Sequence, residues 1–211
     1  VAFAGTGSQG WGGNNGPALN AQFNRPRGIH KSSAGNVYIA DTNNHEIRYI
    51  DAASKIIYSV AGVGTTAGYN CNDCSPTSAL LDTPEGVYID TSGNVYIADT
   101  DNHIVRKVIA GGNIVNVAGT PGSGGFSGDG GAATGARLRE PRDVALDGNG
   151  NIYIADTRNC RIRRVDGVTS VITTYAGTGT CGFNGDGVAT STRFNRPRGL
   201  SFDTAGNLYV A

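Results

Sequence analysis

Asn94-Val95-Tyr96-Ile97-Ala98-Asp99-Thr100 is the stretch that decides the fold, because the same pattern occurs four times in the sequence. The other copies begin at Asn36, Asn151 and Asn207, so successive copies lie 58, 57 and 56 residues apart. A recurrence at nearly constant spacing of this size is typical of repeat proteins, whose units pack against their neighbours.

Two more segments recur with the same step and mark the limits of each unit. An Ala-Gly pair closes the units at Ala4, Ala61, Ala118 and Ala176. A proline segment precedes each copy of the strand pattern: Arg25-Pro26-Arg27-Gly28, Thr83-Pro84-Glu85-Gly86, Glu140-Pro141-Arg142-Asp143 and Arg196-Pro197-Arg198-Gly199. Three segments that recur in one register indicate a true internal repeat.

Each unit is predicted to contain four strands, named a to d in chain order. In the second unit they cover residues 86–90, 95–98, 104–108 and 114–117, which are rich in β-branched and aromatic side chains. Glycine supplies the positive φ of the turn between strands a and b. Four antiparallel strands followed by a long Gly-rich return connection predict an all-β fold, a β-propeller of four-stranded blades.

The whole chain, residues 1–211, is predicted to be a single propeller segment. Its blade units are expected at about 1–7 (partial), 23–64, 81–120, 138–179 and 194–211 (partial). About four repeats with partial units at both ends, in a sequence without Met, suggest a segment of a larger propeller, with six blades as our estimate. Because strands alternate in direction, the b–c turns and the d–a connections should share one face, here called the loop face.

The composition argues against several classes of protein. The 211 residues carry 17 basic and 17 acidic side chains, and the net charge is zero. This balance argues against a protein that mainly grips nucleic acid through phosphates, and no apolar run approaches the ~20 residues of a membrane helix. Residues 1–105 hold 5 basic and 9 acidic side chains, and residues 106–211 hold 12 and 8, so head-to-tail self-association is conceivable.

The b–c segment Asp99-Thr100-Asp101-Asn102-His103-Ile104-Val105-Arg106-Lys107-Val108 resembles the NHL repeat family. Residues 41–48 and 156–163 match it, although Cys160 stands where histidine is expected. The connections 125–131 and 182–187 resemble those of secreted bacterial and teneurin-like NHL propellers. The resemblance implies a β-propeller. Because NHL proteins include binding modules, RNA-binding propellers, extracellular sensors and a few lyases, it does not settle the activity.

The four cysteines leave three alternatives. Cys160 at a b–c turn and Cys181 in the following connection share the loop face, so a disulfide between them is geometrically reasonable, and Cys71 and Cys74 could close a small local loop. Bridged cysteines would place the chain in an oxidising compartment, extracellular or at the cell surface. Free thiols, or metal or redox chemistry, are the other two alternatives.

Several residues recur in every unit and are expected to be structural. They are the aspartates Asp41, Asp99 and Asp156 with the arginines Arg48, Arg106 and Arg163, which should form charge-assisted bonds. His45 and His103 recur in the same way, with a ligand-lining role as the alternative. Aromatic residues, including the sole tryptophan Trp11, recur in the connections and should pin these onto the blades.

A ring of arginines on the loop face is the candidate binding site. Arginine follows the proline in three units, and Glu85 takes that place in the second. The guanidinium group is suited to bidentate recognition of carboxylates. This candidate surface consists of Arg25, Arg27, Arg142, Arg196 and Arg198, with Trp11, His45 and His103 as further candidates.

Two kinds of segment resemble short cofactor or calcium motifs. Residues 5–10 and 177–182 fit G-x-G-x-x-G, but a dinucleotide site needs a helix after the loop, and no helical period follows. Asp129 and Asp186 each stand alone between glycines, whereas a calcium loop needs several carboxylates. We therefore predict no cofactor, no metal and no catalytic residue in this segment.

We interpret the sequence as a noncatalytic extracellular binding or assembly module for a protein, a glycan or further copies of itself. An NHL-type lyase, with a metal site completed by blades outside this segment, is the alternative reading. An RNA-binding propeller is disfavoured by the zero net charge.

Overall fold

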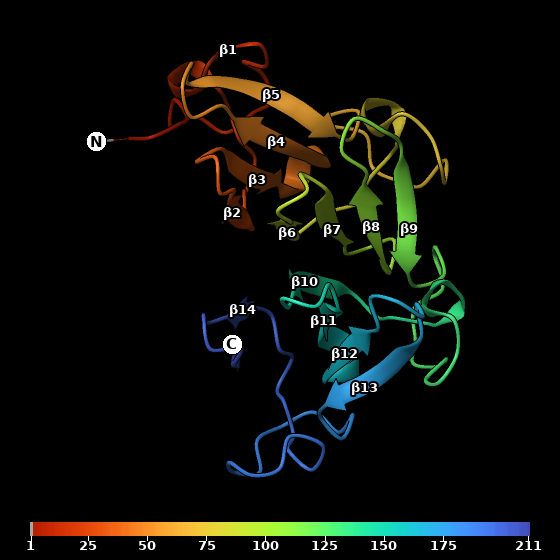
Figure 1. Cartoon of the computed structure of the whole chain (residues 1–211). Helices are drawn as coiled ribbons and strands as arrows, with labels where there is room; N and C mark the ends of the chain where they lie inside the picture. Colours follow the sequence, from red (N-terminus) through yellow and green to blue (C-terminus); the bar gives the residue numbers. More distant parts are fainter. Residues whose placement is uncertain (1) are drawn as a thin grey trace. The chain divides into compact units, whose positions relative to one another are not determined.

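The computed structural model describes residues 2–211, and within them every regular element is a strand or a short 3-10 turn. Each of the first three sheets contains the predicted four strands in the order a-b-c-d (Figure 1). No helix in this described part is long and apolar enough to cross a membrane.

The first sheet is a full blade with one extra strand. Its order is β1-β5-β4-β3-β2, and neighbouring strands run antiparallel. The elements of this part of the chain are β1 (Gly16–Pro17), η1 (Ala18–Asn20), β2 (Ile29–Lys31), β3 (Val37–Asp41), η2 (Thr42–Asn44), β4 (Glu46–Ile50) and β5 (Ile56–Ala61).

The remaining strands form two four-stranded sheets and one pair. The second sheet has the order β6-β7-β8-β9, the third β10-β11-β12-β13, and β14 pairs with β15. Their elements are η3 (Pro76–Ser78), β6 (Gly86–Ile89), β7 (Val95–Asp99), β8 (Ile104–Val108), β9 (Ile114–Ala118), η4 (Ala133–Gly135), β10 (Pro141–Leu146), β11 (Ile152–Asp156), η5 (Thr157–Asn159), β12 (Arg161–Val165), β13 (Ile172–Ala176), β14 (Leu200–Phe202) and β15 (Leu208–Val210).

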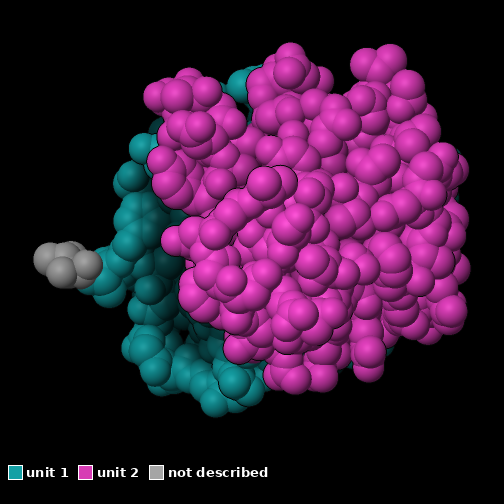
Figure 2. Space-filling model, turned by 90° about the horizontal axis from the view of Figure 1, so that it is seen from below, with its two compact units in different colours: residues 1–97, 107–115 teal, residues 98–106, 116–211 magenta. Residues whose placement is uncertain are grey.

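The chain forms two compact units, coloured separately in Figure 2. Unit 1 contains residues 1–97 and 107–115, and unit 2 contains residues 98–106 and 116–211. Because side chains alternate between the two faces of a strand, unit 1 has a core on each face of its first sheet. One contains Val37 and Ile39, and the other contains Ala40 with Leu81.

Unit 2 has a smaller core between its own strands. Tyr153, Ala155 and Ile162 of the third sheet pack with partly buried side chains of β14 and β15, including Leu200 and Leu208. The two-stranded sheet therefore covers one face of the third blade through the same alternation of apolar side chains that builds unit 1.

The first described residues share backbone features with the ends of the later units, although they form no strand. Residues 2–7 contain no strand. The N–H groups of Gly5 and Thr6 instead donate to the carbonyls of Ala18 and Ala21, both at 2.9 Å. Gly5 also has φ of 90°, a left-handed conformation outside the β region that glycine adopts without strain. The same bond and conformation occur at Gly62, Gly119 and Gly177, directly after β5, β9 and β13, so this segment follows the same course as the ends of those strands.

Candidate functional site

The candidate arginines lie on three of the four proline segments, those before β2 and β14 and the one that opens β10, whereas the segment before β6 carries Thr83 and Glu85. The residue before each proline has a left-handed backbone, which is rare for non-glycine residues. A threonine of the preceding b–c turn fixes the next segment: Thr42 donates its hydroxyl to the carbonyl of Pro84 at 2.8 Å, and Thr157 donates to Pro197 at 2.7 Å. The left-handed residues are Arg25, Thr83, Glu140 and Arg196, with φ of 52°, 44°, 49° and 58°.

His45 and His103 hold the same segments from a second side. The Nδ1 atom of His45 accepts the backbone N–H of Thr83 at 3.0 Å, and Nδ1 of His103 accepts that of Glu140 at 3.3 Å. Each histidine is itself left-handed and ends a b–c turn, with φ of 54° and 61°. Both rings therefore serve to position the left-handed residue before the next proline.

The recurring Asp–Arg pairs are buried. Each of the six side chains is 0% exposed. Arg48 Nη1 lies 3.3 Å from Asp41 Oδ2, and the matching distances are 4.0 Å for Arg106–Asp99 and 3.3 Å for Arg163–Asp156. Burial raises the pKa of Asp156 to about 6, against the lowering effect of Asn159, the N–H of Arg139 and Arg163.

The buried arginines also clamp the Gly-rich connections. Arg48 donates to the carbonyls of Gly12 and Gln22, both at 2.8 Å, and to Oδ1 of Asn14 at 2.9 Å. In the third blade, Arg163 donates to Asp129 Oδ1 at 2.6 Å. The Asp of the first Gly-Asp-Gly motif is therefore an arginine partner, in the position that Asn14 occupies two connections earlier, in unit 1.

The structure pairs all four cysteines as the sequence suggested. Cys71 is bonded to Cys74 and Cys160 to Cys181, with sequence separations of 3 and 21. Cys160 is fully buried at the end of η5, whereas Cys181 is exposed in the following connection. Neither pair is placed as a metal ligand or a free thiol in this structure.

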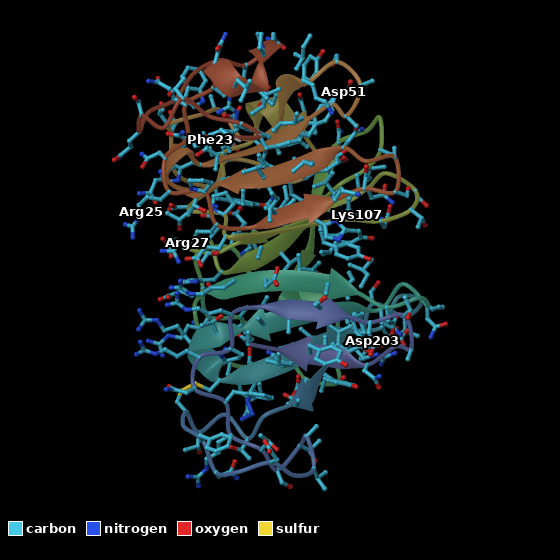
Figure 3. All side chains as sticks on the ribbon, turned by 90° about the vertical axis from the view of Figure 1, so that its left-hand side faces the viewer. Phe23, Arg25, Arg27, Asp51, Lys107 and Asp203 are labelled. Atoms are coloured by element: carbon cyan, nitrogen blue, oxygen red, sulfur yellow. A yellow bond between two sulfur atoms is a disulfide. The ribbon has the colours of Figure 1, made fainter. Side chains whose placement is uncertain are left out.

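The five candidate arginines fall into paired and unpaired groups. Arg27 lies 3.3 Å from the carboxylate of Glu85, and Arg142 lies 3.2 Å from that of Glu140. Among the described residues, no carboxylate pairs with the other three, Arg25, Arg196 and Arg198, and all three are exposed. In unit 1, Arg25 and Arg27 lie at one end of the strands, and Asp51 and Lys107 at the other (Figure 3).

The unpaired arginines belong to two identical hexapeptides, a repetition that extends beyond the proline segments compared above. Phe-Asn-Arg-Pro-Arg-Gly occurs at residues 23–28 and again at 194–199. Each copy borders a hollow. The hollow beside Arg25 is about 300 Å³ and is otherwise lined by Phe23 and residues 4–9. The hollow beside Arg196 and Arg198 is about 600 Å³ and is otherwise lined by Cys181, Asn195 and Ala211.

The two G-x-G-x-x-G segments, residues 5–10 and 177–182, form turns in their connections. In the first, Thr6 Oγ1 accepts the N–H of Ser8 at 3.2 Å, and in the second Thr178 Oγ1 accepts that of Thr180 at 3.3 Å. Neither is followed by a helix, so the requirement for a dinucleotide site is not met.

Trp11 pins its connection through a polar contact. Its indole N–H donates to Glu46 Oε2 at 2.8 Å, and Glu46 is 1% exposed. Phe126, at the matching place in the third connection, lies under the guanidinium of Arg161, 4.0 Å from its ring centroid. Glu46 and Arg161 both open a strand c. The aromatic residue of each connection matches this side chain, because an indole N–H can donate to a carboxylate and a phenyl ring can stack under a guanidinium.

Asp143 and His30 are polar residues of the inner strands that act between neighbouring blades. Asp143 Oδ2 accepts the N–H of Leu200 at 2.8 Å, and burial raises the pKa of Asp143 to about 6. His30 Nδ1 accepts the N–H of Ile89 at 3.3 Å, and burial lowers its pKa. The sequence analysis missed Asp143, although it replaces the glycine found at this place in the other three units.

No group of three or more His, Cys, Asp or Glu side chains within residues 2–211 could hold a metal ion. The chemistry that the surface does offer is recognition of negative charge, because exposed guanidinium groups without carboxylate partners can donate two parallel hydrogen bonds to a carboxylate.

Comparison with known proteins agrees with this architecture. The family model described as "Teneurin NHL domain" matches residues 65–165 and 114–180, which together span more than half of the chain, and "NHL repeat" matches residues 23–48. NHL repeat-containing protein 2 of Gallus gallus is 37% identical over 56% of this chain and 16% of its own length.

Two further similarities extend over most of the chain. The chloroplastic Protein SUPPRESSOR OF QUENCHING 1 of Arabidopsis thaliana is 27% identical over 90% of this chain and 24% of its own length. An auxiliary nutrient binding protein from Bacteroides thetaiotaomicron superposes with a TM-score of 0.67 and 16% identity, covering 96% of this chain and 52% of its own, and shows the fold alone.

This chain thus spans a quarter or less of these curated relatives and about half of the solved structure. The repeats, the four-stranded sheets and the family models agree, and the chain belongs to the NHL-repeat family of β-propellers.

Proposed function

We propose that this chain is a noncatalytic binding module whose loop face binds acidic segments of a protein partner. The observation that carries the proposal is the pair of Phe-Asn-Arg-Pro-Arg-Gly segments, in which Arg25, Arg196 and Arg198 are exposed and meet no carboxylate of residues 2–211. Other cations of the loop face, such as Arg27 and Arg142, already have acidic partners.

The local structure supports presentation of these side chains to a ligand. Arg25 and Arg196 each have a left-handed backbone, a conformation that non-glycine residues keep only where the surrounding structure holds it. In the second copy, the hydroxyl of Thr157 also donates to the carbonyl of Pro197 at 2.7 Å, which holds this segment in place. A guanidinium on a rigid loop loses less conformational freedom on binding than one on a mobile loop, which favours affinity.

The other candidate residues support a binding role over catalysis. His30, His45 and His103 each use Nδ1 to accept a backbone N–H. The buried aspartates pair with arginines. These groups are therefore occupied in holding strands and connections together.

We further propose that the chain works in an oxidising compartment, outside the cell or at its surface. The support is the pairing of all four cysteines, since such bridges persist mainly in oxidising environments. Intact mass with and without a reductant after alkylation would test this in material purified from the native source. Alkylation of all four cysteines without reductant would contradict it.

The binding proposal is tested with a short fluorescent oligoglutamate peptide. In the variant Arg25→Ala/Arg196→Ala/Arg198→Ala, we expect the affinity to fall about tenfold relative to Arg25→Ala alone, because the two exposed charge pairs of Arg196 and Arg198 contribute up to about 1.4 kcal/mol together. Lys107→Ala is the control, since Lys107 lies at the other end of the unit 1 strands (Figure 3).

Unchanged affinity in the triple variant, or no binding by the native protein, would reject the proposal. If an oligogalacturonate binds more tightly than oligoglutamate, the ligand of this surface is an acidic glycan rather than a protein. Weaker binding at higher salt is expected in either case, because the exposed charges are screened.

A further inference from the structure

The third b–c turn differs from the first two in one side chain. Cys160 ends this turn with φ of 51°, close to the 54° of His45 and the 61° of His103 at the matching places. The backbone is therefore the same in all three turns, and only the chemistry of the side chain has changed.

The change of side chain replaces a hydrogen bond by a covalent bond. His45 and His103 accept the N–H of the residue before the next proline, Thr83 or Glu140. Arg196 is the corresponding residue after Cys160. Cys160 is bonded instead to Cys181, in the connection that leads to Arg196.

The disulfide adjoins the surface that we propose to bind acidic ligands. Cys181, Asn195, Arg196 and Arg198 line one hollow of about 600 Å³. From this arrangement we infer that the Cys160–Cys181 disulfide is a redox-sensitive tie that regulates binding at Arg196 and Arg198. The identity of the ligand in this inference rests on the proposed function. That the disulfide holds the connection in place does not depend on it.

The connection that leads to the first copy of the hexapeptide contains no cysteine, so it can be compared with the disulfide-bonded connection before the second copy. Gln9 stands five residues after Ala4, as Cys181 stands five residues after Ala176. The amide of Gln9 donates to Oδ1 of Asn24 at 3.0 Å, which ties that connection directly to the residue before Arg25. Binding at Arg25 should therefore not respond to a reductant.

The two cysteines differ in solvent exposure, and this difference determines which sulfur atom a reductant attacks first. Cys181 is exposed and Cys160 is fully buried. A thiolate of a dithiol reductant attacks Sγ of Cys181, and Cys160 leaves as a thiolate that takes up a proton. The second thiol of the reductant then releases Cys181 and closes a cyclic disulfide. Two electrons pass to the protein, which gains two thiols.

The tie is tested first without any ligand. The variant Cys71→Ala/Cys74→Ala keeps only the Cys160–Cys181 bridge, so dithiothreitol acts on this bond alone. We expect amide hydrogen exchange in residues 177–195 to become faster on reduction and to recover on reoxidation, while residues 5–24 remain unchanged. Unchanged exchange in residues 177–195 would overturn the inference.

Regulation of binding is tested with the oligoglutamate peptide on the same variant carrying Arg25→Ala, which isolates the second copy. If the reduced loop spends about a tenth of its time in the binding geometry, the apparent dissociation constant rises about tenfold. Equal affinity in both redox states would reject the regulation. Absence of binding by the oxidised native protein would instead reject the proposed function, and the exchange experiment would still decide whether the disulfide is a tie.

Discussion

At the scale of single residues, Asp143 stands where the other units have glycine, and its side chain forms a hydrogen bond to the next blade. Gly28, Gly86 and Gly199 occupy its place in the other units. The added carboxylate accepts the N–H of Leu200 in the next inner strand, at 2.8 Å, and the N–H of Val144 at 2.9 Å. Its environment nevertheless opposes ionisation, because burial raises its pKa to about 6.

The raised pKa predicts how stability depends on pH. Between about pH 4, the ordinary range of an unfolded Asp, and pH 6, the folded state keeps a proton on Asp143 that the unfolded state releases. Stability should therefore fall as the pH rises through this window, by up to about 3 kcal/mol for this group. Asp156 acts in the same direction.

The variant Asp143→Asn separates the two aspartates. It cannot ionise, so its free energy of unfolding in urea should decline less than that of the native protein between pH 4 and pH 7. The difference between the two proteins isolates Asp143, since Asp156 is present in both. Parallel pH profiles would show that Asp143 titrates alike in the folded and unfolded states.

At the scale of the element, the b–c turn explains why its residue types recur. In the first blade, Asp41 accepts the N–H of Asn24 at 2.8 Å, and Asn44 donates to the carbonyl of Gly10 at 2.8 Å. Thr42 and His45 reach forward to Pro84 and Thr83. One short turn thereby joins the connection before its blade to the inner strand after it.

Removal of one of these ties should have a local effect. His45→Ala removes the ring nitrogen that accepts the N–H of Thr83, which we expect to cost about 1–2 kcal/mol, because a partly buried hydrogen bond is lost. The exchange rate of the Thr83 amide should rise, while the Glu140 amide, held by His103, stays protected and serves as the control. Equal exchange of Thr83 in the variant and the native protein would contradict the role of His45.

The sequence was sufficient for elements whose pattern is local. The Val-Tyr-Ile-Ala block predicted β3, β7 and β11, because alternating β-branched and aromatic residues between turns fit a pleated sheet. Pairings between elements were harder to predict. Whether Arg27 meets Glu85, or Trp11 meets Glu46, depends on how far apart packed loops lie, and spacing along the chain does not encode that distance.

Part of the candidate surface could be predicted and part could not. The proline segments located the arginines, but which of them keep an exposed charge depends on neighbours from other segments. Glu140 illustrates this, since its carboxylate meets both Arg142 and Arg158, at 3.2 and 2.8 Å. The identical hexapeptides could have singled out Arg25 and Arg196, because the two intervening units replace these residues with Thr83 and Glu140.

At the scale of the whole molecule, stability in a repeat protein is approximately a sum over units and the interfaces between neighbours. Cross-links add to this sum mainly by restricting the unfolded chain, and the restriction grows with the loop that is closed. The two disulfides close loops of very different size, with sequence separations of 21 and 3. They should therefore contribute unequally to the stability of the whole chain.

Loop closure predicts about 3 kcal/mol for Cys160–Cys181 and about 2 kcal/mol for Cys71–Cys74. Calorimetry of Cys160→Ala/Cys181→Ala should thus show a larger fall in Tm than Cys71→Ala/Cys74→Ala, by a few degrees in a chain of this size. Burial adds to the difference, because Cys160 is fully buried and its truncation leaves a cavity. The native protein in reductant should approach the combined loss of both variants. A larger effect of the Cys71–Cys74 variant would mean that folded-state contacts around the short loop, rather than chain entropy, determine what these bridges contribute.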